Sequence, residues 1–245
     1  MRDFDELVGE AEAAPIVGWD FSWLDGRATE ARPSWQFRER VARRAATANA
    51  MLELSCGDGT LLAALPHTPP LVVATEGYWP NATIAAQRIE NLIATLDNEL
   101  PLRDEAFDLV TSRHPIVAWW NEVARVLEPD GAYVAQHVGP GSGREITSWL
   151  MGPHTISMAR HPDHARRAAM AVGLDVVDLR AENLPMIFDD IGAVVYFLRL
   201  VVWMVPDFSV PRYRDRLRAM HEHIEKRGPF HATSARFFID ARKLA

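Results

Sequence analysis

The stretch MLELSCGDGTLLAAL, residues 51–65, decides the fold. Its apolar beginning predicts a buried strand over Met51–Leu54, and Gly57 and Gly59 predict a tight turn that leads into a helix. Glycine lets bare backbone amides approach a ligand closely, and the beginning of a helix favours negative charge. The turn therefore predicts a binding site for a nucleotide-like ligand.

A carboxylate follows the next apolar run. Leu71–Thr75 predicts a second strand, and Glu76 stands at its end, about 20 residues beyond the turn, where an acid can accept both hydrogen bonds of a ribose diol. The dinucleotide fingerprint needs a third small residue, and Leu62 occupies that place. S-adenosylmethionine carries an ammonium and a sulfonium, and Glu53 is well placed for it, so the layout favours this cofactor.

Short apolar runs alternate with amphipathic segments from Ala50 to Val138, which is typical of βαβ units and a mostly parallel sheet. The predicted strands are 51–54, 71–75, 92–96, 107–111, 132–137, 174–179 and 235–241. The predicted helices are 37–48, 117–127, 164–172, 191–205 and 211–227. The pattern predicts an α/β fold.

Composition favours a small-molecule substrate. The 245 residues carry a net charge of −7, which gives no general attraction to nucleic acid or to an anionic membrane. The acidic start predicts a cytoplasmic protein, and the apolar run 191–205 is shorter than the roughly 20 residues of a membrane span. His221 and His223 point to different helix faces, and HPDH at 161–164 lacks further ligands nearby, so no metal site is expected.

Four motifs together resemble the class I S-adenosylmethionine-dependent methyltransferases, in particular a methyltransferase type 11-like bacterial group. LELSCGDG matches the first motif, with Glu53 as its acid, Gly57 and Gly59 as its later glycines, and Ser55 in place of its first glycine. ATEGYWPN, LDNELPLRDEAFDLV and ARVLEPDGAYV follow in the family's order. The resemblance covers the central half of the chain, from Met51 to His137.

The resemblance implies a doubly wound, Rossmann-like, seven-stranded sheet with helices on both faces and a helical cap. The implied parts are a lead-in segment over 1–49, a cofactor-binding core over 50–180, a helical insertion over 181–233 and a final strand over 234–245. The implied contacts to S-adenosylmethionine are Glu53, Leu54, Ser55, Cys56, Gly57, Gly59, Glu76, Gly77, Tyr78, Asp97, Asn98 and Arg113. Either Asp97 or Asn98 takes the place that contacts the adenine.

The fourth predicted strand ends in TSRHP, where the methyl end of the cofactor is expected. His114 is the candidate general base because its ordinary pKa lies near neutrality. Its alternative role is a hydrogen bond to a loop carbonyl. Arg113 either orients an acidic substrate or bridges a loop to a surface acid. Methyl transfer depends largely on positioning, so the sequence need not contain a fixed catalytic pair.

Eight tryptophans suit an aromatic wall for a planar or apolar acceptor. The candidate acceptor-binding residues are Trp19, Trp23, Trp120, Arg199 and Trp203, each with core packing or surface solvation as its alternative. We expect the acceptor pocket between the lead-in segment and the late insertion.

The predicted function is methyl transfer from S-adenosylmethionine to a small molecule, with the oligomeric state left open. One alternative is an RNA base methyltransferase that uses the basic segments RERVARR (38–44) and RYRDRLR (212–218). Another is a non-catalytic S-adenosylmethionine-binding module, a reading that Ser55 keeps open. A dehydrogenase is disfavoured by Leu62.

Overall fold

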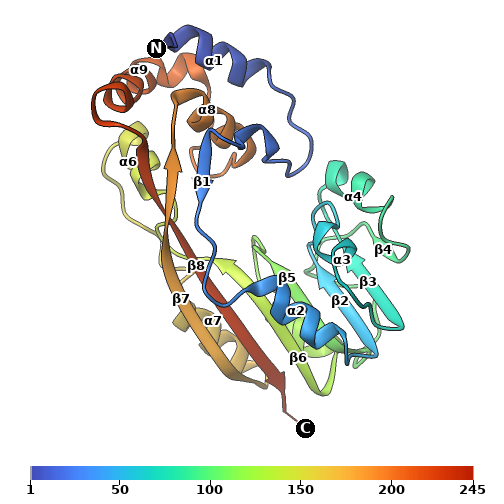
Figure 1. Ribbon diagram of the computed structural model, residues 1–245. Helices are drawn as coiled ribbons and strands as arrows, with labels where there is room; N and C mark the ends of the chain where they lie inside the picture. Colours follow the sequence, from blue (N-terminus) through green and yellow to red (C-terminus); the bar gives the residue numbers. More distant parts are fainter. Residues whose placement is uncertain (1, 245) are drawn as a thin grey trace. The chain divides into compact units, whose positions relative to one another are not determined.

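The computed structural model describes residues 2–244, which form an α/β fold (Figure 1). The strands are β1 (Ala28–Glu30), β2 (Ala50–Leu54), β3 (Leu71–Thr75), β4 (Leu92–Ile93), β5 (Phe107–Arg113), β6 (Leu127–Val138), β7 (Leu174–Phe188) and β8 (Phe230–Lys243). The helices are α1 (Phe4–Ala13), α2 (Phe37–Ala45), α3 (Thr60–Ala63), α4 (Trp79–Ala85), α5 (Trp120–Val126), α6 (Arg144–Met151), α7 (Pro162–Ala171), α8 (Ile191–Leu200) and α9 (Val210–Arg227), with a 3-10 turn at Ser22–Leu24.

The sheet has the order β1-β7-β8-β6-β5-β2-β3-β4. The pairs β2–β3, β2–β5, β3–β4 and β5–β6 are parallel, whereas β6–β8 and β1–β7 are antiparallel. The mostly parallel, Rossmann-like sheet predicted from the motifs is therefore confirmed. The sheet has eight strands rather than the predicted seven, because Ala28–Glu30 pairs with Met186–Phe188 at the end of β7. A strand of three residues is too short to give a readable period.

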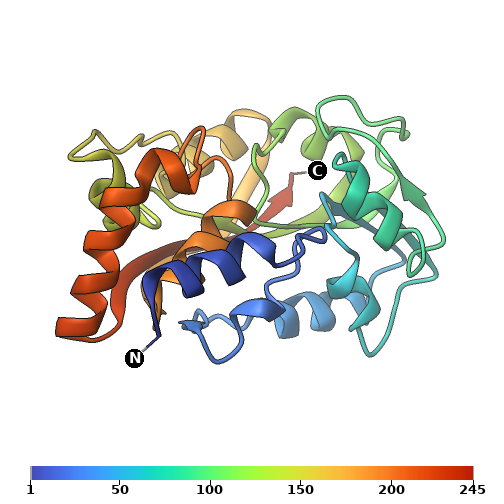
Figure 2. The ribbon, with the colours of Figure 1, turned by 90° about the horizontal axis from the view of Figure 1, so that it is seen from above.

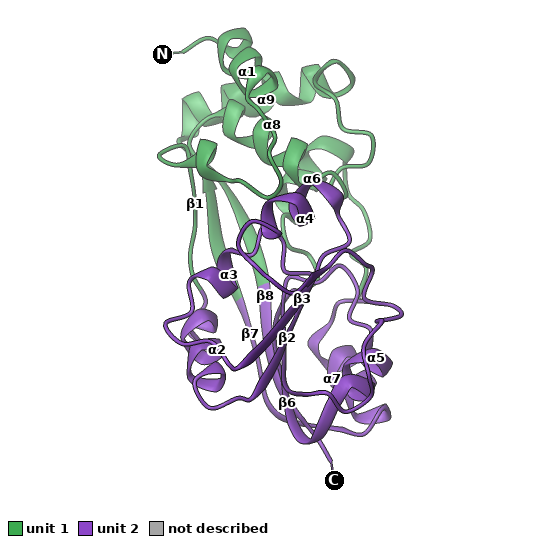
Figure 3. Ribbon diagram, turned by 90° about the vertical axis from the view of Figure 1, so that its right-hand side faces the viewer, with its two compact units in different colours: residues 1–32, 140–158, 183–235 green, residues 33–139, 159–182, 236–245 purple. Residues whose placement is uncertain are grey.

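The chain divides into two compact units, coloured separately in Figure 3. Unit 1 comprises Met1–Arg32, Pro140–Met158 and Asn183–Ala235, and unit 2 comprises Pro33–Gly139, Ala159–Glu182 and Arg236–Ala245. Strands β7 and β8 contribute residues to both units. Each unit has its own buried core, and we describe each by itself.

Unit 2 is a three-layer sandwich. Helices α2 and α3 lie on one side of the sheet, and α5 and α7 lie on the other (Figure 3). Successive strand residues alternate between the two layers, as the pleat of a strand requires. Met51 and Ala132 join the cluster with Phe37 and Val41 of α2, whereas Leu52 and Tyr133 join the cluster on the opposite face.

Unit 1 is built on helix packing. Helix α1 lies beside α8 and α9, which Figure 2 shows as the blue helix alongside the orange and red ones. Helix α8 is buried on almost every side, in agreement with its apolar sequence. It ends at Leu200 and not at Val205 as predicted. Val201 leaves the helical conformation, with φ −99° and ψ 60°, and residues 201–207 form bends and turns.

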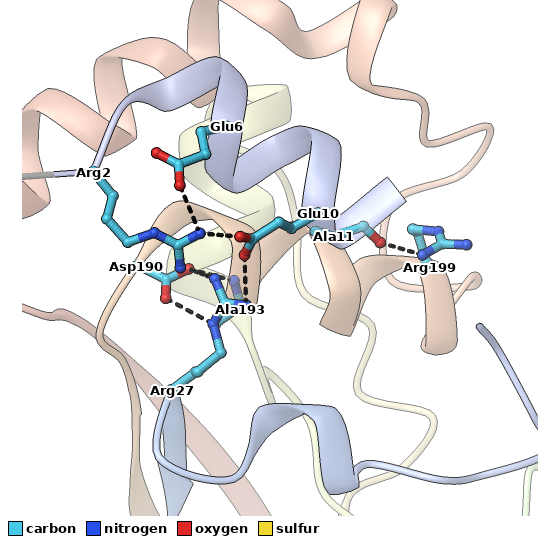
Figure 4. A network of polar contacts seen from close by, with 8 residues as sticks. All are labelled: Arg2, Glu6, Glu10, Ala11, Arg27, Asp190, Ala193 and Arg199. Atoms are coloured by element: carbon cyan, nitrogen blue, oxygen red, sulfur yellow. Dashed lines mark hydrogen bonds and ion pairs between the residues drawn. The ribbon is translucent and has the colours of Figure 1, made fainter. Parts of the chain in front are cut away.

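Polar contacts join the lead-in segment of unit 1 to its late insertion (Figure 4). The guanidinium of Arg27 donates to both carboxylate oxygens of Asp190, at 2.9 and 3.0 Å. Asp190 also accepts from the backbone N–H of Ala193 at 2.9 Å, so it caps the beginning of α8. Glu10 of α1 contacts Arg2 and Arg27. This network fixes the lead-in on the helical insertion within one compact unit.

Other predicted boundaries differ where polar residues interrupt the expected pattern. The strand expected at 92–96 ends at Ile93, and the chain then turns so that Asp97 is buried. Strand β6 begins at Leu127, but its register with β5 shifts between Phe107↔Leu127 and Leu109↔Ala132. Residues 128–131 therefore bulge out of the ladder, between the helix predicted over 117–127 and the strand predicted over 132–137.

Candidate functional site

The glycine turn after β2 has an unusual backbone. Ser55, Gly57 and Gly59 have φ values of +52°, +64° and +80°, all in the left-handed region. Serine thus adopts the conformation for which glycine is normally chosen, at a cost of roughly 1–2 kcal/mol. A Cβ at Gly59 would lie 2.8 Å from Cδ1 of Ile89. Ser55, which stands in place of the first glycine of the motif, thus keeps the left-handed backbone conformation that a glycine would adopt there.

Asp97 holds Ser55 in this conformation. The Ser55 hydroxyl donates to Oδ2 of Asp97 at 2.5 Å, and the Thr75 hydroxyl donates to Oδ1 at 2.6 Å. The backbone N–H of Ser55 in turn donates to Oγ1 of Thr75 at 3.2 Å. Asp97 is buried, whereas Asn98 is exposed. Which of these two residues contacts an adenine stays a prediction, but their environments differ clearly.

Glu76 crosses the same turn. Its Oε2 accepts from the backbone N–H of Gly57 and its Oε1 from that of Tyr78, each at 2.7 Å. Burial raises the pKa of this carboxyl, and these backbone donors oppose the rise. Gly77 lies against Leu96, whose Cδ2 would be 2.6 Å from an added Cβ, and the Tyr78 ring is exposed. The acid predicted to bind a ribose therefore lies directly beside the turn.

Glu53 on β2 is the most buried acid of the site, with 1% of its surface exposed. Burial raises its pKa to about 8, the charge of Arg113 opposes this rise, and the charge of Asp58 adds to it. Its Oε2 has no hydrogen-bond partner among the described residues. A buried carboxyl without a partner is costly to ionise, so at neutral pH it is mostly protonated in the absence of a cation.

Leu54 and Cys56 contribute backbone and packing. Leu54 is buried in the sheet, and the N–H of Cys56 donates to the carbonyl oxygen of Thr75 at 2.8 Å. Burial and the charges of Glu53 and Glu76 raise the pKa of the Cys56 thiol. A thiol in this environment stays protonated and is a poor nucleophile.

His114 follows β5 with a left-handed backbone, at a φ of +58°. Its backbone N–H donates to the carbonyl oxygen of Gln136 at 2.6 Å. Its Nε2 lies 2.8 Å from the amide Nε2 of Gln136, whose Oε1 accepts from the indole N–H of Trp35 at 2.7 Å. Burial and the charges of Arg236 and Arg113 hold the pKa of His114 well below its ordinary value. His114 is therefore a neutral imidazole.

The contacts of Gln136 and Trp35 with the surroundings of His114 were not predicted from the sequence. The signal that marks Gln136 is a polar amide in the otherwise apolar run AYVAQHV, at the carboxyl end of a buried strand. Thr75, which joins Asp97 to the turn, has the same kind of signal. Trp35 is one of three tryptophans that precede α2, and nothing in the surrounding sequence distinguishes it from the other two.

Three aromatic candidates for the acceptor lie in unit 1. Trp19 and Trp203 meet edge to face, with ring centroids 5.3 Å apart. Trp23 stacks on Tyr196 at 4.7 Å and lies under the guanidinium of Arg27 at 3.9 Å, so its ring is engaged in packing. Trp203 is exposed, whereas Trp19 and Trp23 are both partly buried.

A pocket of about 430 Å³ lies in the same unit, between the lead-in segment and the late insertion. Its lining residues are Ile16, Leu198, Arg199, Val202, Asp207 and Phe208. Nη1 of Arg199 also donates to the carbonyl oxygens of Ala11 and Ala14, the latter at 2.9 Å (Figure 4 draws the bond to Ala11). Arg199 therefore donates hydrogen bonds to carbonyl groups at the end of α1 and also lines the pocket.

The fourth tryptophan candidate is Trp120. It belongs to unit 2, where its ring meets that of Tyr133 at 5.5 Å and stacks on that of His137 at 6.3 Å. The structure therefore places it in an aromatic cluster of the sheet.

Several arginines of the basic segments 38–44 and 212–218 form ion pairs with acids. Arg40 pairs with Asp178 at 3.2 Å and Arg44 with Asp240 at 2.7 Å. Arg214 and Arg218 both pair with Asp5. Among residues 2–244 no helix combines the length and apolar character that a membrane span needs, and no three His, Cys, Asp or Glu side chains gather as metal ligands would.

Comparison with known proteins matches residues 52–135 to a family model described as a methyltransferase domain. No curated protein matches the sequence. Among similar solved structures, the YcgJ protein of Bacillus subtilis has a TM-score of 0.62 at 14% identity, over 86% of this chain and 99% of that chain.

Two further structures are similar in fold. A Haemonchus contortus phosphoethanolamine N-methyltransferase, in complex with phosphomonomethylethanolamine and S-adenosylhomocysteine, has a TM-score of 0.52 at 16% identity, over 86% of this chain and 54% of that chain. The 4+2 cyclase SpnF has a TM-score of 0.52 at 18% identity, over 98% of this chain and 92% of that chain. Residues 52–135 therefore match a methyltransferase domain, and the chain has the Rossmann-like fold of the class I S-adenosylmethionine-dependent methyltransferases, as its four motifs predicted.

Proposed function

We propose that this chain binds S-adenosylmethionine at the turn after β2 and transfers its methyl group to a small molecule. The observation that carries the proposal is the group of buried acids, Glu53, Glu76 and Asp97, around a left-handed glycine turn. The carboxyl ends of the parallel strands β2, β3 and β4 bring these acids together, which is where ligands bind in open α/β sheets.

Charge favours this cofactor over a dinucleotide. A pyrophosphate would bring negative charge next to Glu76 and Asp97, which would repel it, and next to Glu53, which gains nothing from an anion. Helix α3 has only four residues, so its dipole offers little compensation, and Leu62 is buried in the place where a dinucleotide needs a small residue. S-adenosylmethionine instead brings an ammonium and a sulfonium to the acids.

The roles of the residues follow from their positions. The amides around Ser55 and Gly57 and the carboxyl of Glu53 would hold the amino-acid end, and Glu76 the ribose diol. The bound cofactor supplies a methyl group on a sulfonium, a good leaving group. The protein then has to orient the acceptor for in-line attack and exclude water from it. His114 and Arg113, at the carboxyl end of β5, are the residues we assign to the acceptor side.

Several observations support a small acceptor. The basic segments that RNA would need are paired with acids, and the net charge is −7. Unit 1 holds a pocket of about 430 Å³ with both apolar and charged lining residues, a size in the range of small-molecule sites. One protein of similar fold is crystallised with a small phosphorylated amine. We assign Trp19, Trp203 and Arg199 to acceptor binding.

Calorimetry of the purified chain tests cofactor binding. S-adenosylmethionine and S-adenosylhomocysteine should both give heat, and Glu76→Ala should weaken both by at least tenfold, because a bidentate acceptor is lost. Glu90→Ala, at an exposed acid on the same unit, is the matched control and should leave the affinity unchanged. Absence of heat for both compounds with the native chain would overturn the proposal.

Transfer of an isotope-labelled methyl group tests the acceptor class. Label should appear in the small-molecule fraction of a cell extract and not in its RNA. Label in RNA would refute the small-molecule assignment. Tight binding without any transfer would favour the non-catalytic module instead.

A further inference from the structure

The hydrogen bonds around His114 have a fixed direction that begins at Trp35. An indole N–H can only donate, so the atom of Gln136 that faces it, at 2.7 Å, is the carbonyl oxygen of the side-chain amide. The NH₂ group of that amide then faces Nε2 of His114 at 2.8 Å. Trp35 is 2% exposed and Gln136 is 5% exposed, so water does not replace either residue in these hydrogen bonds.

An amide NH₂ can only donate, so Nε2 of His114 has to accept. A neutral imidazole carries one proton, and that proton therefore lies on Nδ1. A proton on Nε2 would set two donors against each other at a partly buried contact, which costs about 1–3 kcal/mol. The charged and titratable groups that act on the ring are Arg236, Arg113 and His137, and all of them oppose a second proton.

Gln136 also holds the backbone of His114. Its carbonyl oxygen accepts from the N–H of His114 at 2.6 Å, and His114 keeps a left-handed φ of +58°. Gln136 pairs in register with Arg113, the last residue of β5, so the same strand position fixes the backbone and the ring of the next residue. His114 is thus held by two hydrogen bonds to Gln136, one at its backbone N–H and one at its ring. A non-glycine residue in this conformation is strained, and such strain often occurs at functional sites.

We propose that Trp35 and Gln136 are positioning residues that lock His114 as the Nδ1–H tautomer, so that His114 presents a neutral hydrogen-bond donor to an anionic oxygen of the acceptor. The inference refines the proposed function, on which its acceptor part rests. The locked ring replaces the general-base role that its ordinary pKa suggests, because its only unprotonated nitrogen is already an acceptor. Arg113 and Arg236, whose charges both reach the ring, favour an anion over a neutral oxygen.

Nitrogen NMR of ¹⁵N-labelled protein tests the tautomer without cofactor or acceptor, so this test is independent of the proposed function. His114→Asn identifies the ring signals. We expect Nδ1 protonated and Nε2 unprotonated throughout pH 5.5–8. Trp35→Phe should release the amide and give a mixture of tautomers. Gln136→Glu, which replaces the donor by an acceptor, should move the proton to Nε2 or yield the imidazolium.

Trp120→Phe is the matched control, since it removes another tryptophan of unit 2 that packs on His137, and it should leave the His114 signals unchanged. Protonated Nε2 in the native chain, or an unchanged tautomer in folded Gln136→Glu, overturns the inference. For the anion, titration with acetate and with inorganic phosphate separates a carboxylate from a phosphate. At least one should shift the Nδ1 signal of the native chain and shift it less in Gln136→Glu. No shift with either anion would refute the acceptor part alone.

Discussion

Replacing Glu53 by glutamine should make the protein more stable at high pH and almost unchanged at low pH. Glu53 is 1% exposed and has an unpartnered carboxylate oxygen, and burial raises its pKa from 4.5 to about 8. Glutamine has nearly the same shape as a protonated glutamate and cannot ionise. The substitution therefore removes the cost of ionisation and leaves the packing in place.

The magnitude follows from proton linkage. Between pH 4.5 and 8 the folded state holds the Glu53 proton and the unfolded state does not, so the free energy of unfolding falls as the pH rises through this window. One pKa unit corresponds to 1.36 kcal/mol, so the full shift is worth about 5 kcal/mol. Between pH 5 and pH 8 the native chain should lose about 3.5 kcal/mol relative to Glu53→Gln.

Urea unfolding followed by tryptophan fluorescence at pH 5, 6, 7 and 8 measures this difference. Because all other titrating groups are shared, they cancel when the two proteins are compared at each pH. Glu90→Gln, at an exposed acid, is the control and should follow the native chain at every pH. A difference between Glu53→Gln and the native chain that stays constant from pH 5 to pH 8 would refute a raised pKa at Glu53.

The remaining predictions concern the glycine turn. Ser55→Ala should cost about 2 kcal/mol in urea unfolding because the bond to Asp97 is lost while the left-handed strain remains, and Ser55→Gly should cost about 1 kcal/mol less. A smaller loss for alanine than for glycine would contradict this reading. Gly59→Ala should lower the melting temperature, and adding Ile89→Val, which removes the clashing methyl group, should restore part of the loss. Cys56 should react with a disulfide reagent at pH 8 only when the protein unfolds, and rapid reaction of the folded chain would show a more accessible thiol.

Much of unit 2 could be predicted because its signals are local. A buried parallel strand is a short apolar run, and Leu71–Thr75 agrees with the structure at both ends. The acids Glu53 and Glu76 follow from their places on two adjacent strands. Strand β7 was predicted only as far as Leu179, because most of its residues up to Phe188 are partly buried or exposed and so give no continuous apolar run.

The contacts around His114 could not be predicted because they depend on register. Gln136 lies opposite Arg113 only once β5 and β6 are aligned, and their register shifts at a bulge. Trp35 reaches Gln136 from 101 positions away in sequence. Sequence alone gives His114 its ordinary pKa near neutrality, and the base hypothesis rested on that value. The donors and cations that change it come from other elements.

The acids around the glycine turn say more about the ligand than the fold does. A cyclase and an N-methyltransferase both have folds similar to this chain at 18% identity or less, so the fold alone does not fix the reaction. The acids around the turn should distinguish ligands, because Glu53 and Glu76, whose pKa values are raised by burial, are stabilised in their ionised form by a cation and not by a pyrophosphate. If cofactor binding supplies the cation that lets Glu53 ionise, binding should release a proton near neutral pH, and the affinity should rise with pH up to about 8. Calorimetry in two buffers of different ionisation enthalpy detects that proton, and its absence in Glu53→Gln would locate it. A proton that persists in Glu53→Gln would have to come from another group, and the charge argument for Glu53 would then fail.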